Sequence, residues 1–197
     1  MMQINDFWEE EWNKRILGDG TVKFNVGKAE KILGNLKGRE YFKPHKILDI
    51  GCGPAFHAIR ILQDDPTYKN RWYGIDLAQN AVQFFQEQGL QGECGSIYNF
   101  NPNGNKFGIF LLLDTLEHIM DRDRLAGKIK ELAEQKYIIF GNIPLYTDKV
   151  NGGAGFENPM DIGILKKFMK DAGIPEFDYL VYGIYGWPYM MFEGKVL

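Results

Sequence analysis

The chain has 197 residues, of which 45% are hydrophobic and 25% charged, and its formal net charge is −3. This balance is typical of one globular domain with a substantial core, and it argues against a general nucleic-acid binder. No apolar run is long enough to span a bilayer, the N-terminus lacks a signal-peptide pattern, and Cys52 and Cys94 form neither a disulfide framework nor a zinc signature. We therefore expect a cytoplasmic protein without a structural metal.

The N-terminal part of the chain, residues 1–45, is expected to form a helical cap on a core at residues 46–197. An amphipathic helix is predicted at 5–17, where two tryptophans are spaced by one helical turn, and a second helix at 28–36. The whole chain is thus predicted to be a single domain.

The stretch from 46 to 56, KILDIGCGPAF, is typical of a buried parallel strand that leads through a glycine-rich turn into a helix. Gly51 and Gly53 allow positive φ angles and the close approach of a ligand to the backbone. Asp49 stands on the strand, where its carboxylate would repel a pyrophosphate and favour a cationic ligand. The turn alone is equally compatible with an ordinary strand connection.

A second strand is predicted at 71–76, followed by a helix at 78–88 that Gly89 terminates. Asp76 closes this strand about 25 residues beyond the first glycine, the spacing at which an acid accepts hydrogen bonds from ribose hydroxyls. The alternative is a carboxylate that caps the next helix, and one side chain can serve both purposes.

A weak third strand at 91–97 precedes the most apolar run of the chain, at 109–113. This run predicts a central buried strand, and Asp114 follows it at the carboxyl end, where ligands bind in α/β folds. His118 is the best candidate for a general base, because an unperturbed imidazole titrates near neutral pH. The alternative for Glu117 and His118 is a turn whose polar groups satisfy backbone amides.

The rest of the chain continues the alternation of helices and strands. The predicted elements are a helix at 121–135, a strand at 136–142, a substrate loop or surface excursion at 146–159, a helix at 161–172, and two antiparallel strands at 176–185 and 187–193. The fold class is therefore α/β, a doubly wound Rossmann-like sheet of seven mostly parallel strands with an antiparallel C-terminal strand.

Three separated motifs resemble, in their order, those of the class I S-adenosylmethionine-dependent methyltransferases, in particular the small-molecule, UbiG-like (type 11) group. They are the spacing Asp49-x-Gly51-x-Gly53-x-Ala55, the strand-terminal Asp76, and the run DTLEHI at 114–119. The resemblance covers about residues 46–197.

The resemblance implies that S-adenosylmethionine binds across the carboxyl ends of the first four strands. The glycine turn would hold its methionine end, Asp76 its ribose, and residues 114–116 would form the wall beside the sulfonium. Ser96 stands where an Asp usually contacts the adenine amine, so this contact would be uncharged. The implied cofactor-binding residues are Asp49, Gly51, Cys52, Gly53, Asp76, Leu77, Ser96, Ile97, Asp114, Thr115 and Leu116.

The expected activity is transfer of a methyl group to a small-molecule acceptor by in-line displacement, which leaves S-adenosylhomocysteine. An alternative is a catalytically inactive module that binds S-adenosylmethionine and regulates or stabilises a partner. A nicotinamide-dependent oxidoreductase is disfavoured by Asp49 and by the incomplete glycine triplet. The acceptor, the pathway and the oligomeric state do not follow from the sequence.

Overall fold

The computed structural model describes residues 4–17, 44–54, 56–145, 160–184 and 187–196. Its strands are β1 (Ile47–Ile50), β2 (Trp72–Asp76), β3 (Gln91–Cys94), β4 (Phe107–Leu113), β5 (Ala133–Pro144), β6 (Phe177–Ile184) and β7 (Trp187–Val196). Its helices are α1 (Ile4–Leu17), α3 (Phe56–Asp64), α4 (Gln79–Glu87), α5 (Arg122–Leu132) and α6 (Ile162–Asp171), with 3₁₀ turns η2 (Pro66–Arg71), η3 (Ile97–Asn99) and η4 (Leu116–His118).

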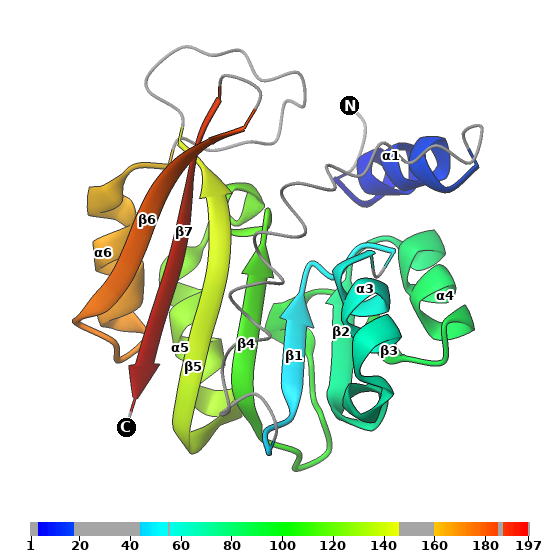
Figure 1. Ribbon diagram of the computed structural model, residues 1–197, viewed down its shortest axis with the longest axis horizontal. Helices are drawn as coiled ribbons and strands as arrows, with labels where there is room; N and C mark the ends of the chain where they lie inside the picture. The colour runs from blue at the N-terminus through cyan, green and yellow to red at the C-terminus, as the bar shows by residue number, and fades with distance from the viewer. Residues whose placement is uncertain (1–3, 18–43, 55, 146–159, 185–186, 197) are drawn as a thin grey trace. The chain divides into compact units, whose positions relative to one another are not determined.

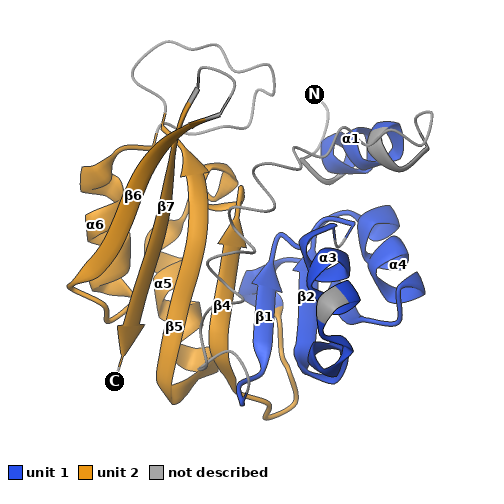
Figure 2. Cartoon of the chain, in the orientation of Figure 1, with its two compact units in different colours: residues 1–99 blue, residues 100–197 orange. Residues whose placement is uncertain are grey.

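The strands form a seven-stranded sheet in the order β3-β2-β1-β4-β5-β7-β6 (Figure 1). The pairs β1/β2, β2/β3 and β4/β5 are parallel, whereas β7 runs antiparallel to both β5 and β6. The predicted Rossmann-like fold class, with its antiparallel C-terminal strand, is confirmed. The chain divides into two compact units, residues 1–99 and 100–197, which Figure 2 colours separately.

The first unit contains α1, α3, α4 and the strands β1 to β3. All four residues of β1 are buried, as expected for a parallel strand covered on both faces. Helix α4 packs against β2 and β3 and buries Ala81, Val82 and Phe85. Gly89 ends this helix with φ +75°, a conformation that glycine adopts without a steric penalty.

The second unit contains β4 to β7, with α5 and α6 packed against each other on the same side of its strands (Figure 1). All seven residues of β4 are buried, which explains its unbroken apolar sequence. Asp121 caps α5 by accepting a hydrogen bond of 3.0 Å from the amide of Arg124, and Asp161 caps α6 through the amide of Ile164 at 2.8 Å.

Several element boundaries differ from the sequence-based predictions. Helix α5 ends at Leu132 and β5 begins at once with Ala133, because that residue is extended (φ −73°, ψ 148°) and pairs with Phe107 of β4. Strand β3 ends at Cys94, so Ser96 and Ile97 lie in the following turn rather than on the strand. The predicted helix at 28–36, the loop at 146–159 and Ala55 of the glycine turn lie outside the described residues.

Within the described ranges, no helix combines the length and the apolar character that a membrane crossing requires.

Candidate functional site

The glycine turn after β1 is held against the end of β2 by backbone hydrogen bonds. Gly51 and Gly53 have φ angles of +70° and +51°, as the sequence led us to expect. The amides of Gly51 and Cys52 donate to the carbonyl oxygen of Ile75 at 2.8 and 3.2 Å. The amide of Gly53 donates to Oδ2 of Asp76 at 2.9 Å. The turn is therefore held to β2 both by a backbone carbonyl oxygen and by a side-chain carboxylate.

Asp76 uses both carboxylate oxygens to organise the backbone around it. Oδ2 accepts from Gly53, and Oδ1 accepts from the amide of Ala78 at 2.9 Å, directly before α4. Only 9% of the residue is exposed, and this burial raises the pKa of the carboxyl group, while the hydrogen bonds from Ala78 and Gly53 act in the opposite direction. The structure thus supports the role of Asp76 in the turn that leads into α4.

Asp49 is buried, as expected for a residue on a buried parallel strand. It is 3% exposed, and Nε1 of Trp72 donates to its Oδ2 at 3.1 Å. Burial raises the pKa of Asp49 from an ordinary value of 3.8 to about 7, with a smaller contribution from the Asp76 carboxylate and an opposing one from the Trp72 hydrogen bond. A cation bound nearby would favour the ionised form and would therefore find a ready counter-charge.

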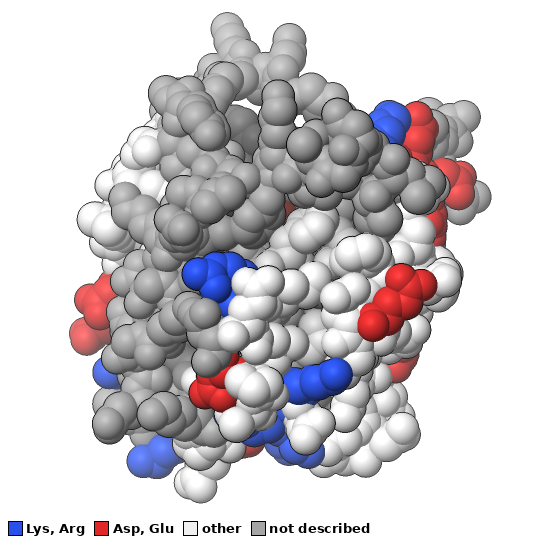
Figure 3. Space-filling model, turned by 45° about the vertical axis from the view of Figure 1, so that its right-hand side comes forward, with Lys and Arg blue, Asp and Glu red and all other residues white. Residues whose placement is uncertain are grey.

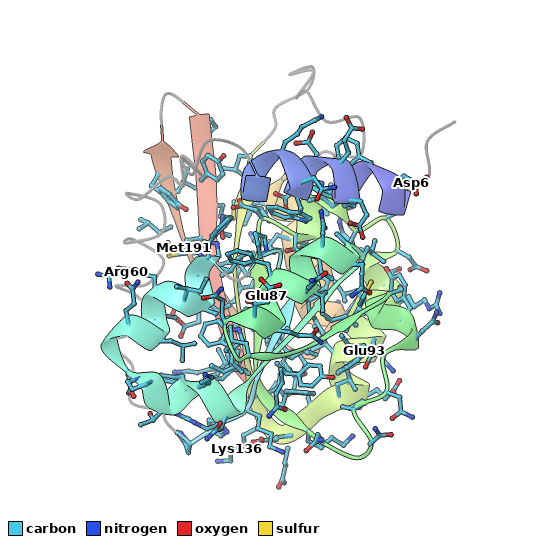
Figure 4. The ribbon with its side chains drawn as sticks, turned by 90° about the vertical axis from the view of Figure 1, so that its right-hand side faces the viewer. Asp6, Arg60, Glu87, Glu93, Lys136 and Met191 are labelled. Atoms are coloured by element: carbon cyan, nitrogen blue, oxygen red, sulfur yellow. The ribbon has the colours of Figure 1, made fainter. Side chains whose placement is uncertain are left out.

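Helix α1 lies against the beginning of α4 (Figure 4, in which Asp6 marks the first turn of α1 and Glu87 the end of α4). The Glu9 carboxylate accepts from the amides of Gln79 and Asn80, and the Asn80 side chain donates to the carbonyl oxygen of Glu9 at 2.8 Å. Glu9 thereby satisfies amides that the first turn of a helix leaves without partners. The sequence carried no signal for this contact, because the two helices are about 70 residues apart.

Trp12 of α1 packs against the glycine turn itself. A Cβ atom built on Gly53 would lie 2.9 Å from Cζ2 of Trp12, and the positive φ of Gly53 also disfavours a side chain. Only glycine therefore fits at this point of contact.

The remaining candidates of the first unit lie around the end of β3. The amide of Gly95 donates to the carbonyl oxygen of Asp76 at 2.8 Å, which holds the turn containing Ser96 beside Asp76. Leu77 is half-buried, and Ile97 is 5% exposed. The unit therefore gathers the candidates of β1, β2 and β3 at the carboxyl ends of these strands. Cys52 is buried, and this burial raises its pKa, so its thiol is not activated as a nucleophile.

In the second unit, Asp114 follows β4 and is tied to Asn142 of β5. The amide of Asp114 donates to the carbonyl oxygen of Asn142 at 3.1 Å, and Nδ2 of Asn142 donates to Oδ1 of Asp114 at 2.7 Å. Thr115 donates to the carbonyl oxygen of Leu113 at 3.1 Å, and Leu116 is fully buried. Asn142 was not among the predicted site residues, although a polar residue at the end of the apolar run YIIFGNI was a signal for it.

Glu117 and His118 lie on η4. The amide of His118 donates to the carbonyl oxygen of Thr115 at 2.9 Å. Nε2 of the His118 imidazole lies 4.0 Å from Oε1 of Glu117. Glu117 is 2% exposed, and the His118 side chain is 17% exposed. The pair therefore forms a compact turn in which the imidazole keeps some access to solvent. No group of three potential metal ligands occurs among the residues that the structure describes.

A family model described as "Methyltransferase domain" matches residues 47–135. Among solved structures, the magnesium protoporphyrin IX methyltransferase of Synechocystis PCC 6803 with bound S-adenosylmethionine aligns with a TM-score of 0.70 and 16% identity over 98% of this chain and 94% of that chain. A methyltransferase of Thermotoga maritima, titled a possible histamine N-methyltransferase, aligns with a TM-score of 0.68 and 14% identity over 95% of this chain and 98% of that chain. The [4+2]-cyclase SpnF aligns with a TM-score of 0.62 and 16% identity over 77% of this chain and 74% of that chain.

Proposed function

Because the chain carries a methyltransferase domain of the class I S-adenosylmethionine-dependent kind, we propose that it transfers a methyl group from S-adenosylmethionine to a small-molecule acceptor. The observation that carries this proposal is the buried carboxylate of Asp49, two residues before a glycine turn with positive φ angles. A cationic nucleoside is stabilised by this arrangement, whereas the pyrophosphate of a dinucleotide is repelled. Membership of the UbiG-like group stays a prediction.

The residues of the first unit would hold most of the cofactor. We assign the methionine end to the turn of Gly51, Cys52 and Gly53 above Asp49, and the ribose to Asp76 with Leu77. Each carboxylate oxygen of Asp76 already accepts a hydrogen bond from a backbone amide. Ribose hydroxyls would therefore donate to the remaining lone pairs of these two oxygens. Ser96 and Ile97 are assigned to the adenine.

Asp114, Thr115 and Leu116 of the second unit are assigned to the side of the sulfonium. The acceptor attacks the methyl carbon with a lone pair, and the electrons of the breaking C–S bond remain on sulfur, which gives S-adenosylhomocysteine. A sulfonium methyl group is already activated, so the protein contributes mainly proximity and alignment. A hydroxyl acceptor must also lose a proton, and His118 is assigned to accept it.

The surface charge gives no support to a nucleic-acid acceptor. On the face drawn in Figure 3, the described Lys and Arg side chains are distributed among acidic and uncharged residues. A nucleic-acid substrate calls for a continuous basic surface that follows the phosphate backbone. The net charge of −3 points the same way.

Binding and transfer can be tested separately. We expect calorimetry to detect binding of S-adenosylhomocysteine and no binding of NADH, because Asp49 selects against a pyrophosphate. Tight binding of NADH alone would overturn the proposal in favour of an oxidoreductase.

Incubation with methyl-labelled S-adenosylmethionine and a metabolite extract should then label a small molecule. Cofactor binding without any labelled product would instead favour the inactive regulatory module.

His118→Ala is expected to reduce methyl transfer to a hydroxyl acceptor by about a hundredfold, because it removes the proton acceptor. Binding of S-adenosylhomocysteine should stay within about twofold, since the cofactor contacts are assigned to other residues. The rate of label transfer and the calorimetric affinity are the two measurements. Equal transfer rates for the wild type and the variant would remove His118 from the mechanism.

A further inference from the structure

Asp114 adopts an unusual backbone conformation. Its φ is +51°, and the one other residue besides glycine with positive φ in the described part of the chain is Asn103, in the exposed turn before Gly104. The left-handed region is unfavourable for an L-residue and persists where the surroundings enforce it. In contrast to Asn103, Asp114 stands directly after a fully buried strand.

Asn142 makes two hydrogen bonds with Asp114 in this conformation. Its carbonyl oxygen accepts from the Asp114 amide at 3.1 Å, and its Nδ2 donates to Oδ1 of Asp114 at 2.7 Å. The second bond also fixes the orientation of the amide, because only the nitrogen can donate to a carboxylate. Asn142 is fully buried, so its rotamer is fixed by packing as well.

The same geometry is unfavourable for Asn142 itself. With Nδ2 turned to Asp114, Oδ1 of Asn142 is buried and has no hydrogen-bond partner among the described residues. Leaving a buried acceptor unsatisfied destabilises the folded state, whereas an apolar side chain of the same shape would avoid this cost. The amide is therefore a poor choice for folding stability and a good one for fixing a neighbouring carboxylate.

We propose that Asn142 is a positioning residue that directs the Asp114 carboxylate toward the sulfonium of the cofactor. This role rests on the proposed function, in which Asp114 stands beside the sulfonium. A carboxylate distinguishes S-adenosylmethionine from S-adenosylhomocysteine, because the first has a positively charged sulfur and the second a neutral one. Asn142 thus sets how strongly the protein prefers the substrate form of the cofactor over the product form.

The test compares the affinities of the two cofactor forms for the wild type, Asn142→Leu and the control Asn105→Leu. Leucine matches the shape of asparagine without its donor, and Asn105 lies in an exposed turn, where its Nδ2 bonds the carbonyl oxygen of Pro102 at 2.8 Å. Asn142→Leu should lower the ratio of S-adenosylmethionine to S-adenosylhomocysteine affinity about tenfold. Asn105→Leu should keep the wild-type ratio.

A second variant covers the case in which Asn142→Leu does not fold. In Asn142→Asp the new carboxyl group titrates as a pair with Asp114, so the pH dependence of the affinity ratio should differ from that of the wild type. An unchanged ratio in either variant, or equal losses for both cofactor forms, would overturn the positioning role and leave the proposed function intact. A wild type that binds neither form would overturn both.

Discussion

Replacing Asp49 by asparagine is expected to raise the free energy of unfolding at pH 8 by up to about 4 kcal/mol. Burial raises the pKa of Asp49 from 3.8 to about 7, so at pH 8 the folded protein carries an ionised carboxylate in a site that disfavours charge. Asparagine keeps the shape and can still accept the hydrogen bond from Trp72. Asparagine removes the charge and therefore also the free-energy cost of burying that charge.

The expected gain in stability at pH 8 follows from the way in which the stability of the wild type depends on pH. Between about pH 4 and pH 7 the carboxyl group is ionised in the unfolded chain and protonated in the folded one, so the wild type loses stability as the pH rises through this window. The pKa of Asp76 is also raised, so part of this loss will remain in Asp49→Asn. We therefore expect a smaller loss in the variant, not its disappearance.

Urea unfolding at pH 5 and pH 8, followed by circular dichroism, measures the effect. Asp178→Asn is the matched control, because Asp178 is exposed on β6 and the same substitution there should leave the pH dependence unaltered. An Asp49→Asn protein that is less stable than the wild type at pH 8 would show that the fold stabilises the ionised carboxylate, contrary to the burial argument.

The same variant should bind S-adenosylmethionine more weakly. In our proposal the cationic cofactor is matched by the ionised form of Asp49, so the wild-type affinity should increase between pH 6 and pH 8 as this group loses its proton. The affinity of Asp49→Asn should be lower at pH 8 and depend less on pH. A gain in stability combined with a loss of binding identifies a residue that is retained for function.

Gly141→Ala is expected to cost about 3 kcal/mol of folding stability. A Cβ atom at this position in β5 would lie 2.7 Å from the carbonyl oxygen of Leu112 on the neighbouring strand β4 and would overlap the ring of Phe192 on β7. The carbonyl oxygen belongs to the sheet backbone, and Phe192 is 1% exposed, so neither neighbour can move aside.

Gly127→Ala is the matched control for this second prediction. Gly127 lies on the exposed side of α5, and a Cβ atom there would meet nothing within 4 Å. Alanine should stabilise the helix by about 0.5–1 kcal/mol, because glycine loses more backbone entropy on folding. Thermal unfolding of both variants separates the effects, and a Gly141→Ala protein as stable as the wild type would contradict the packing at β5.

Most of the fold could be predicted because its signals are local. The apolar runs at 47–50 and 109–113 became the buried strands β1 and β4, and the predicted helices at 121–135 and 161–172 became α5 and α6. The boundary between α5 and β5 could not be predicted. Ala133 has a high helix propensity, and its place on a strand results from pairing with Phe107, 26 residues earlier.

In the candidate site, too, some features follow from the local sequence and others depend on tertiary contacts. The sequence by itself determined which residues stand at strand ends, including Asp49, Gly51, Gly53, Asp76 and Asp114, because strand ends and turns follow from neighbouring residues. Only the tertiary structure decided what these residues contact. Trp72 reaches Asp49, Glu9 caps α4, and Asn142 holds Asp114, each across more than 20 residues of sequence. Such contacts depend on which strands and helices become neighbours, and that is set by packing of the whole chain rather than by any local pattern.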